Sequence, residues 1–343
     1  MKKLAMLYRW IIVSVLLQAV FLSYLNFIYL PNRGTIKATM YEFGDDSLKD
    51  RGIKVPSGAK NITVSYNGLF AAYLNDGQLT IIDVQKGKTV KTLEPAAGEF
   101  TYFRWLPDRD MLIYSTRTST KDKGQVVVST YEIDTSLERA YPNIKSLPEG
   151  SSVTDIELSP LTNIVYVLVK TGESKTRLYK FNIMDDLSFV MNGGAEMLIK
   201  ETAYSDMLYY QNDSNSVMSR NGKTGKASRL LQGSKYRLLC VDSDDKAYIG
   251  FLDKDGKVTE ILSGKSDQDV KQWQKIVLNS PASPSDVFVT PAGPVFIADR
   301  KAGEILKPDG SAAGKFDGSL LEVLDDYIVS LNGNRLELKL IDK

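Results

Sequence analysis

The sequence predicts an all-β protein, a β-propeller of about seven blades, preceded by one N-terminal transmembrane helix. Three observations lead to this fold: an apolar run near the N-terminus, short β-rich runs in the remainder, and a strand–corner–strand pattern that recurs along the chain. With 343 residues, of which 43% are hydrophobic and 25% charged, the chain is long enough to bury a large core and too apolar to be disordered.

The apolar run covers residues 10–30, close to the ~20 residues that a helix needs to cross a bilayer. Trp10, Tyr24 and Tyr29 lie toward its ends, where aromatic side chains anchor helices at the membrane interface. Basic residues are more frequent before the run than directly after it. This bias predicts a cytoplasmic segment at residues 1–9 and an extracytoplasmic body, with the lipid bilayer as a partner of the helix.

A cleaved signal peptide is the alternative interpretation of this segment. The apolar run is longer than the ~7–15 residues of such signals, and no small-x-small cleavage site precedes Pro31. We therefore expect an uncleaved signal anchor of a single-pass plasma-membrane protein, a linker at residues 31–34 and a propeller at residues 35–343.

The body of the chain has the pattern of a β protein. Short runs rich in Val, Ile, Tyr, Leu and Phe alternate with clusters of Gly, Asp, Asn, Ser and Pro, and no segment keeps a 3.6-residue apolar period over three turns. The strand–corner–strand pattern occurs seven times, with corners near residues 67, 108, 162, 206, 244, 292 and 325.

The spacing of these corners predicts the propeller. They lie about 33–54 residues apart, near the ~40–45 residues of a four-stranded blade. Further turn signals follow each corner, such as Asn75-Asp76-Gly77 in the first unit. A single unit cannot bury both faces of its sheet, so the units stack around an axis. Six or eight blades remain alternatives, because some units are long and the fourth is faint.

The final unit, from about residue 319 to 341, has room for only three strands. Residues 35–43 (TIKATMYEF) alternate like a strand and precede the first full unit. We predict that this segment supplies the missing outer strand of the last blade and so closes the ring.

Two stretches resemble known propeller families. Residues 105–115 (WLPDRDMLIYS) resemble the WSPDG-type corner of TolB-like and WD40-like propellers, and residues 289–305 (VTPAGPVFIADRKAGEI) resemble NHL-type and YVTN-type repeats. The resemblance covers roughly residues 60–343 and implies a propeller fold. The chain has no Gly-His and no Trp-Asp dipeptide, which departs from the standard WD40 repeat. The matched positions are structural corners, so the resemblance implies no functional residue.

Composition excludes several kinds of chemistry. The chain has no histidine, which removes Ser-His-Asp triads, Cys-His pairs and histidine metal sites. A net charge of +1 without a basic stripe argues against nucleic-acid binding. The single cysteine, Cys240, is interpreted as a buried thiol. Pairs of aspartates lie in hairpin corners, where Asp is favoured for turn geometry. We expect no catalytic residue, no metal and no cofactor.

Binding is therefore the expected function, because loops on a rigid scaffold are where recognition sits. The first hypothesis is a non-enzymatic scaffold that binds membrane or envelope proteins in a complex for surface polysaccharide synthesis or export. The alternative is a sensor that binds a ligand or glycan in the central channel; a propeller-fold lyase or glycosidase is the third. Arg104 and Arg109 are the candidate binding residues at one rim of the disc, and Trp105 is expected to pack between blades.

Overall fold

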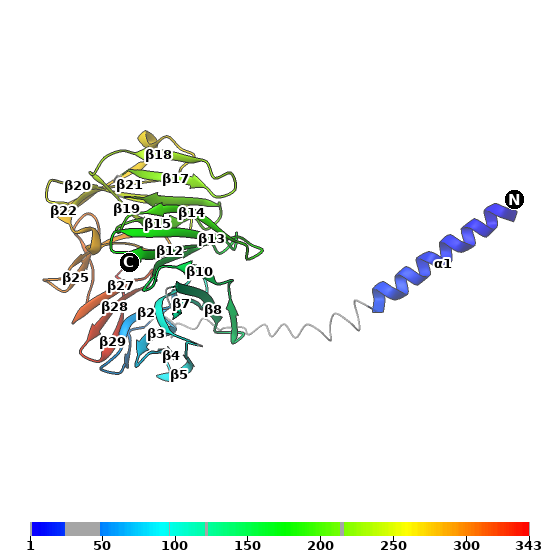
Figure 1. The fold of residues 1–343 in the computed structure, drawn as a ribbon, viewed down its shortest axis with the longest axis horizontal. Helices are drawn as coiled ribbons and strands as arrows, with labels where there is room; N and C mark the ends of the chain where they lie inside the picture. The colour runs from blue at the N-terminus through cyan, green and yellow to red at the C-terminus, as the bar shows by residue number, and fades with distance from the viewer. Residues whose placement is uncertain (1, 25–48, 96, 121–122, 213–215, 343) are drawn as a thin grey trace. The chain divides into compact units, whose positions relative to one another are not determined.

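The structure, a computed structural model, describes residues 2–24, 49–95, 97–120, 123–212 and 216–342. The chain divides into two compact units, Met1–Ser47 and Leu48–Lys343. The described part of the first unit is the helix α1, Lys2–Tyr24. All strands of the described residues lie in the second unit (Figure 1).

The structure contradicts the prediction of a transmembrane helix at residues 10–30. Among the described residues, no helix is both long enough and apolar enough to cross a bilayer. Residues 10–24 of the predicted run, including Trp10 and Tyr24, lie in α1. Tyr29 lies outside the described residues. The predicted single-pass localisation loses its support with the helix.

The second unit is a seven-bladed β-propeller, in agreement with the predicted blade number. Blades one to three contain the following strands: β2 (Lys60–Val64), β3 (Phe70–Asn75), β4 (Gln78–Asp83) and β5 (Lys88–Leu93); β6 (Glu99–Trp105), β7 (Met111–Thr120), β8 (Lys123–Glu132), β9 (Leu137–Ala140) and β10 (Ile144–Leu147); β11 (Ser152–Leu158), β12 (Val165–Gly172), β13 (Lys175–Phe181) and β14 (Leu187–Gly193).

Blades four to six follow the same order: β15 (Leu198–Glu201), β16 (Met207–Gln211), β17 (Val217–Asn221) and β18 (Ala227–Leu231); β19 (Tyr236–Val241), β20 (Ala247–Leu252), β21 (Val258–Gly264) and β22 (Gln274–Ala282); β23 (Val287–Val289), β24 (Val295–Asp299), β25 (Glu304–Leu306) and β26 (Ala312–Lys315). Two short 3₁₀ helices, η2 (Val270–Gln272) and η3 (Pro284–Asp286), connect strands in this part of the chain.

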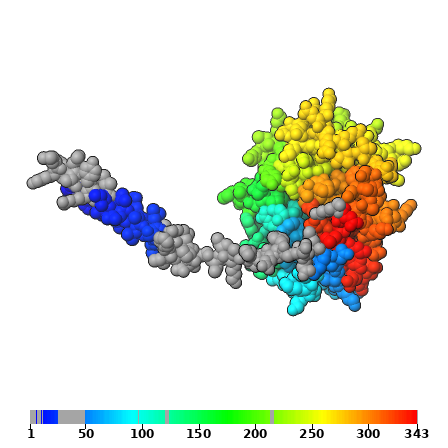
Figure 2. Space-filling model, turned by 180° about the vertical axis from the view of Figure 1, so that it is seen from behind, coloured from blue at the N-terminus to red at the C-terminus, as the bar shows by residue number. Residues whose placement is uncertain are grey.

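The seventh blade joins the two ends of the propeller. Its order is β1 (Arg51–Lys54), β29 (Arg335–Leu340), β28 (Tyr327–Asn332) and β27 (Ser319–Val323). The final unit thus has three strands of its own, as predicted, and β1 pairs antiparallel with β29, Ile53 opposite Leu336. The outer strand predicted at residues 35–43 lies outside the described residues. Figure 2 shows the red C-terminal strands beside the blue start of the propeller.

Position within a blade explains the composition of each strand. The second strands are buried on both faces, as in β12, whose first five residues read Val-Tyr-Val-Leu-Val, and β-branched and aromatic residues suit such a strand. The fourth strands lie at the rim, as in β5, which reads Lys-Thr-Val-Lys-Thr-Leu and is exposed except at its last residue. The first strands surround the central axis.

The hydrophobic core is divided among the contacts between neighbouring blades. Each of the seven buried clusters combines side chains from two successive blades, and the cluster with Ile53, Val64 and Tyr327 joins the seventh blade to the first. Trp105 belongs to the cluster between blades one and two, where its ring stacks on Phe70 at a centroid distance of 6.3 Å. Its predicted place between blades is therefore confirmed.

Candidate binding site at the centre of the ring

All seven predicted corners are turns between the first and second strands of their blades. Because the first strands surround the axis with the same polarity, these turns lie on one face of the propeller. We call this side the corner face and define it by residues 65–69, 106–110, 159–164, 202–206, 242–246, 290–294 and 324–326.

Corner aspartates link neighbouring blades. Asp110 accepts a hydrogen bond of 3.0 Å from the Asn67 side chain, which joins the first two corners. Asp245 accepts hydrogen bonds from three successive backbone N–H groups of the fourth corner, those of residues 203–205. Asp325 accepts one of 3.0 Å from the backbone N–H of Ala292. The sequence interpretation assigned these aspartates to turn geometry alone and missed the contacts between blades.

Other groups complete a circle of hydrogen bonds on the corner face. Arg109 donates to the carbonyl of Pro160 at 3.4 Å, and the Ser159 hydroxyl donates to the carbonyl of Ala203 at 2.9 Å. The remaining contacts are Ser243 N–H to the Pro291 carbonyl at 2.8 Å and Arg51 Nη1 to the Gly68 carbonyl at 3.0 Å. Each of the first six corners is thereby bonded to the next corner, and Arg51 on β1 of the seventh blade bonds the first corner.

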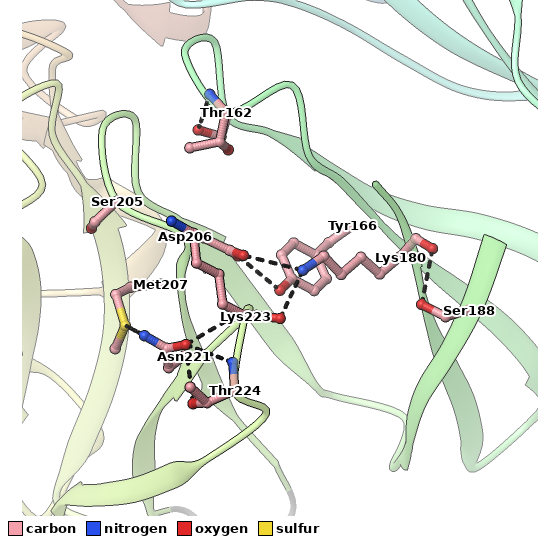
Figure 3. A network of polar contacts seen from close by, with 12 residues as sticks. Thr162, Tyr166, Lys180, Ser188, Ser205, Asp206, Met207, Asn221, Lys223 and Thr224 are labelled. Carbon is pink, nitrogen blue, oxygen red and sulfur yellow. Dashed lines mark hydrogen bonds and ion pairs between the residues drawn. The ribbon is translucent and has the colours of Figure 1, made fainter. Parts of the chain in front are cut away.

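Blades three and four share a buried ion pair as well (Figure 3). Lys180 Nζ on β13 lies 3.2 Å from Asp206 Oδ2 at the fourth corner, and the two side chains are 14% and 3% exposed. Lys180 also donates to the Gly222 carbonyl at 2.9 Å. Gly222 permits this approach, because a Cβ there would lie 1.7 Å from Asp206 Oδ1. The contact therefore requires glycine at position 222.

The first strands can be aligned on the residue whose backbone N–H closes each corner. Two positions before it stand the following residues, in blade order: Thr63, Arg104, Glu157, Lys200, Cys240, Phe288 and Glu322. Charge is concentrated in blades two to four, where a cation, an anion and a second cation follow one another. This arrangement brings opposite charges together across neighbouring first strands.

Arg104 lies in this charged group and not at an outer rim. Its Nη1 is 3.1 Å from Glu157 Oε1 and 3.9 Å from Asp155 Oδ1. Lys200 Nζ bonds the same Glu157 and lies 3.4 Å from Asp155. Burial opposes ionisation of Asp155, but the charges of Lys200 and Arg104 outweigh it and lower the pKa of that carboxyl. The charge of Glu157 likewise raises the pKa of Arg104.

Arg109, the second predicted rim residue, is separate from this group. Its guanidinium pairs with the adjacent Asp108 at 2.7 Å in the second corner. It also provides the link to Pro160 described above. The structure therefore places Arg104 in the channel wall and Arg109 in the circle of corner hydrogen bonds.

A cavity of about 210 Å³ lies at the centre of the corner face. Its wall contains Arg104, Glu157, Lys200, Glu201 and Cys240 from the first strands, and the corner residues Pro107, Pro160, Ala203, Ser243 and Pro291. A second hollow, of about 480 Å³, lies between blades six and seven beside Phe296 and Ile341. The sequence predicted a ligand site in the central channel only as an alternative, and it assigned no wall residue except Arg104 to binding; the second hollow was not predicted.

Burial raises the pKa values of two carboxyl groups and of the thiol on the first strands. Burial raises the pKa of Glu201 well above its usual range, and the charges of Glu157 and Asp206 add to the effect. Burial raises the pKa of Glu322 to about 7, although the N–H of Val64 donates to its carboxylate at 2.5 Å. Burial also raises the pKa of the Cys240 thiol, which disfavours the nucleophilic thiolate.

Within the described residues, no group of three or more Cys, Asp and Glu side chains is arranged to hold a metal ion. The charged side chains of the wall mostly satisfy one another. The carboxylate oxygens of Glu201 are buried without a hydrogen bond of standard geometry among the described residues, although the nearby backbone N–H of Ser159 opposes the rise of its pKa.

Four exposed apolar side chains belong to turns on the corner-face side of blades three and four. Leu161 lies in the third corner and Tyr204 in the fourth, and they are 59% and 64% exposed. Ile183 and Met184 follow β13, which runs parallel to β11, so their turn lies on the same face. They are 64% and 76% exposed. We call these four residues the apolar patch.

Comparison with known proteins identifies the fold. No protein-family model matches the chain, and no curated protein matches it. Among similar solved structures is the β-propeller domain of Cps50 (Swd1) from Myceliophteria thermophila, with a TM-score of 0.51 and 14% sequence identity. The match covers 84% of this chain and 98% of that domain. At this identity the match shows the fold alone, and it supports the propeller fold that the resemblance implied. The chain is thus shown to be a seven-bladed β-propeller.

Proposed function

We propose that the protein is a non-enzymatic scaffold that binds a partner protein on its corner face. The observation that carries this proposal is the apolar patch, in which four large side chains project from one face of two adjacent blades. Single exposed apolar residues are common on proteins, whereas grouped ones mark interaction sites. The role in surface polysaccharide synthesis or export depended on the predicted membrane segment, and it is not part of this proposal.

The surroundings of the patch suit binding. The circle of hydrogen bonds holds the corners in place, so little conformational entropy is lost when a partner docks. Leu161 and Tyr204 belong to corners that are bonded to each other through Ser159 and Ala203. An apolar centre next to a charged cavity resembles the usual division of an interface into an apolar core and polar surroundings.

The test is crosslinking with two variants. We expect a partner protein to be crosslinked to the wild-type chain in extracts of its native cells, and to be lost from the double variant Leu161→Glu, Met184→Glu. Charges in the centre of an interface are costly because they must be desolvated. Both positions are exposed, so thermal unfolding of this variant is expected to match the wild type.

Val277→Glu is the matched control. Val277 is 61% exposed and lies on β22, the fourth strand of blade five. This variant should retain the partner. Equal crosslinking of all three proteins, or equal loss in the control, would contradict the proposal.

A further inference from the structure

The outer strand of blade three, β14, differs in composition from the outer strands of the other blades. It reads Leu-Ser-Phe-Val-Met-Asn-Gly and contains no charged residue. Each of the other outer strands contains a Lys or an Arg; they are β1, β5, β9, β10, β18, β22 and β26. Charged side chains, Lys above all, keep the open edge of a sheet from pairing with another chain. Blade three lacks this protection.

The outer edge of β14 is open to a further strand. Among the described strands, β14 pairs with β13 alone. It has seven residues, and of the outer strands only β22 is longer. A bulge at Val190 interrupts its pairing with β13, but blades one, four, five and six have a bulge at the same place and carry the charge as well. The edge of β14 therefore offers backbone N–H and C=O groups to an added strand.

Apolar side chains accompany this edge. Phe189 is 54% exposed, and its ring lies edge-on to that of Tyr179 on β13 at a centroid distance of 5.9 Å. Val190 and Met191 are half-buried against the cluster between blades three and four. An aromatic or β-branched side chain on an added strand would cover Phe189, and such cross-strand pairs stabilise a sheet.

The charges before β14 indicate the chemistry of the partner. Asp185 and Asp186 directly precede the strand. Asp185 is paired with Arg139 of blade two at 2.5 Å. Asp186 is exposed, and the contact recorded for it is a hydrogen bond of 3.1 Å from the Asn182 amide, with no cation beside it among the described residues. A basic residue at this end of an added strand would complement Asp186.

A second copy of this chain suits the edge less well. Antiparallel self-pairing would bring the C-terminal end of one β14 to Asp186 of the other, and the first charged residue after β14 is Glu196. Parallel self-pairing would bring the two copies of Asp186 together. Like charges in these places disfavour both arrangements, so the edge favours a strand from a different protein.

We propose that the outer edge of β14 binds an extended segment of another protein, which becomes a fifth strand of blade three. The segment is uncharged and rich in apolar residues where it lies along β14. It runs antiparallel and has a Lys or Arg at its C-terminal end, beside Asp186. This rim site does not depend on the apolar patch, and its test needs no native partner. The rim site and the proposed function can therefore fail separately.

Fluorescence anisotropy with the full chain and the labelled peptide TVTYVTRK tests the proposal. We expect saturable binding with a Kd below ~1 mM. The same peptide with N-methyl groups on its Tyr and on the residue at either side cannot donate on both edges, and it should bind at least about tenfold more weakly. The peptide TVTYVTEE should bind about threefold more weakly, because its acidic end meets Asp186.

The variant Phe189→Lys gives β14 the charge that the other outer strands carry. It should weaken binding of TVTYVTRK at least about tenfold. The matched control is Val277→Lys on β22, where the side chain is 61% exposed, and this variant should bind the peptide like the wild type. Both positions are exposed, so the thermal unfolding of both variants should match that of the wild type.

Hydrogen exchange locates the peptide on the wild-type chain without any variant. TVTYVTRK should slow the exchange of backbone amides in residues 187–193 and leave those in residues 274–282 unchanged. No saturable binding, equal binding of the N-methylated peptide, equal binding by Phe189→Lys, or protection confined to other strands would overturn the proposal. A dimer in sedimentation that Phe189→Lys dissociates would overturn it too, because a second copy would then occupy the edge.

Discussion

The contact between blades three and four and the contact between blades seven and one each bury a carboxylate, and they stabilise it in different ways. In the first, the buried Asp206 is neutralised by Lys180 from the neighbouring blade. In the second, the carboxylate of Glu322 is held by the N–H of Val64 and the hydroxyl of Thr63, and β1 adds a strand from the other end of the propeller. One contact is built on paired charge, and the other on strand pairing beside a carboxyl that titrates near neutral pH.

This difference predicts that the two contacts respond to different changes in the protein and in its surroundings. Removing one partner from a buried ion pair leaves an uncompensated charge. The contact between blades three and four should therefore be destabilised when either Lys180 or Asp206 is lost. The closing contact should instead be sensitive to the packing of β1 and to pH. Three measurements separate these dependences.

The largest effect is expected for Ile53→Asp in β1. Ile53 is 8% exposed and packs in the cluster with Val64 and Tyr327. A buried, unpaired charge there should lower the free energy of unfolding by about 4 kcal/mol, as measured by urea unfolding followed by circular dichroism. Val90→Asp makes a similar change on the exposed β5, the outer strand of the first blade, and should cost less than about 1 kcal/mol. Similar losses in both variants would show that β1 does not hold the ring closed.

A smaller loss is expected for Lys180→Met. The variant leaves Asp206, which is 3% exposed, without its cation, and this should cost about 3 kcal/mol of unfolding free energy. The control is Lys86→Met. The side chain of Lys86 is 70% exposed and pairs with Asp83 at 3.0 Å, so its loss should cost less than about 1 kcal/mol. Indistinguishable urea midpoints for the two variants would contradict the assigned role of the buried pair.

The smallest effect, of opposite sign, is expected for Glu322→Gln. Because the pKa of Glu322 in the folded protein is raised to about 7, its contribution to stability is fully present below the unfolded pKa of about 4.3 and is lost as the pH rises through 7. Glutamine does not ionise, so the variant lacks this pH-dependent loss of stability. Its side-chain oxygen can still accept a hydrogen bond from the N–H of Val64. The variant should therefore be more stable than the wild type at pH 8, by about 1–2 kcal/mol.

The dependence on pH provides the control for this variant. The difference between Glu322→Gln and the wild type should shrink as the pH is lowered to 4.5, as measured by urea midpoints at a series of pH values. A difference that stays constant over this range would mean that Glu322 does not titrate as described.

The corners could be predicted from the sequence because their signals are local. Proline, aspartate, asparagine and glycine set turn geometry within a few residues, and all seven corners are turns in the structure. The closing strand lacked such a signal. Arg51–Lys54 reads Arg-Gly-Ile-Lys, a poor β-sequence whose role depends on β29 far along the chain, whereas residues 35–43 alternate without lying in the described part.

Most residues of the central cavity were missed for a different reason. Arg104 stood out because it adjoins the clearest corner, but Glu157, Lys200 and Glu201 lie in ordinary-looking strands. Their meeting depends on the register of separate blades, which a single strand does not reveal. The signal appears when the seven copies are aligned on their corners. At the position one residue before the corner, Glu201 is then the charged residue among Val, Leu and Trp.

The pairing of β1 with β29 has a consequence for synthesis of the chain. Arg51 lies opposite Leu338, about 290 residues later. At ~5–20 residues per second, the ribosome needs roughly 15–60 s to make the intervening chain. During that interval β1 has no strand to pair with, and the first blade has no neighbour on one side. The ring can close only after nearly the whole chain has been released, so the last step of folding is set by the timing of translation.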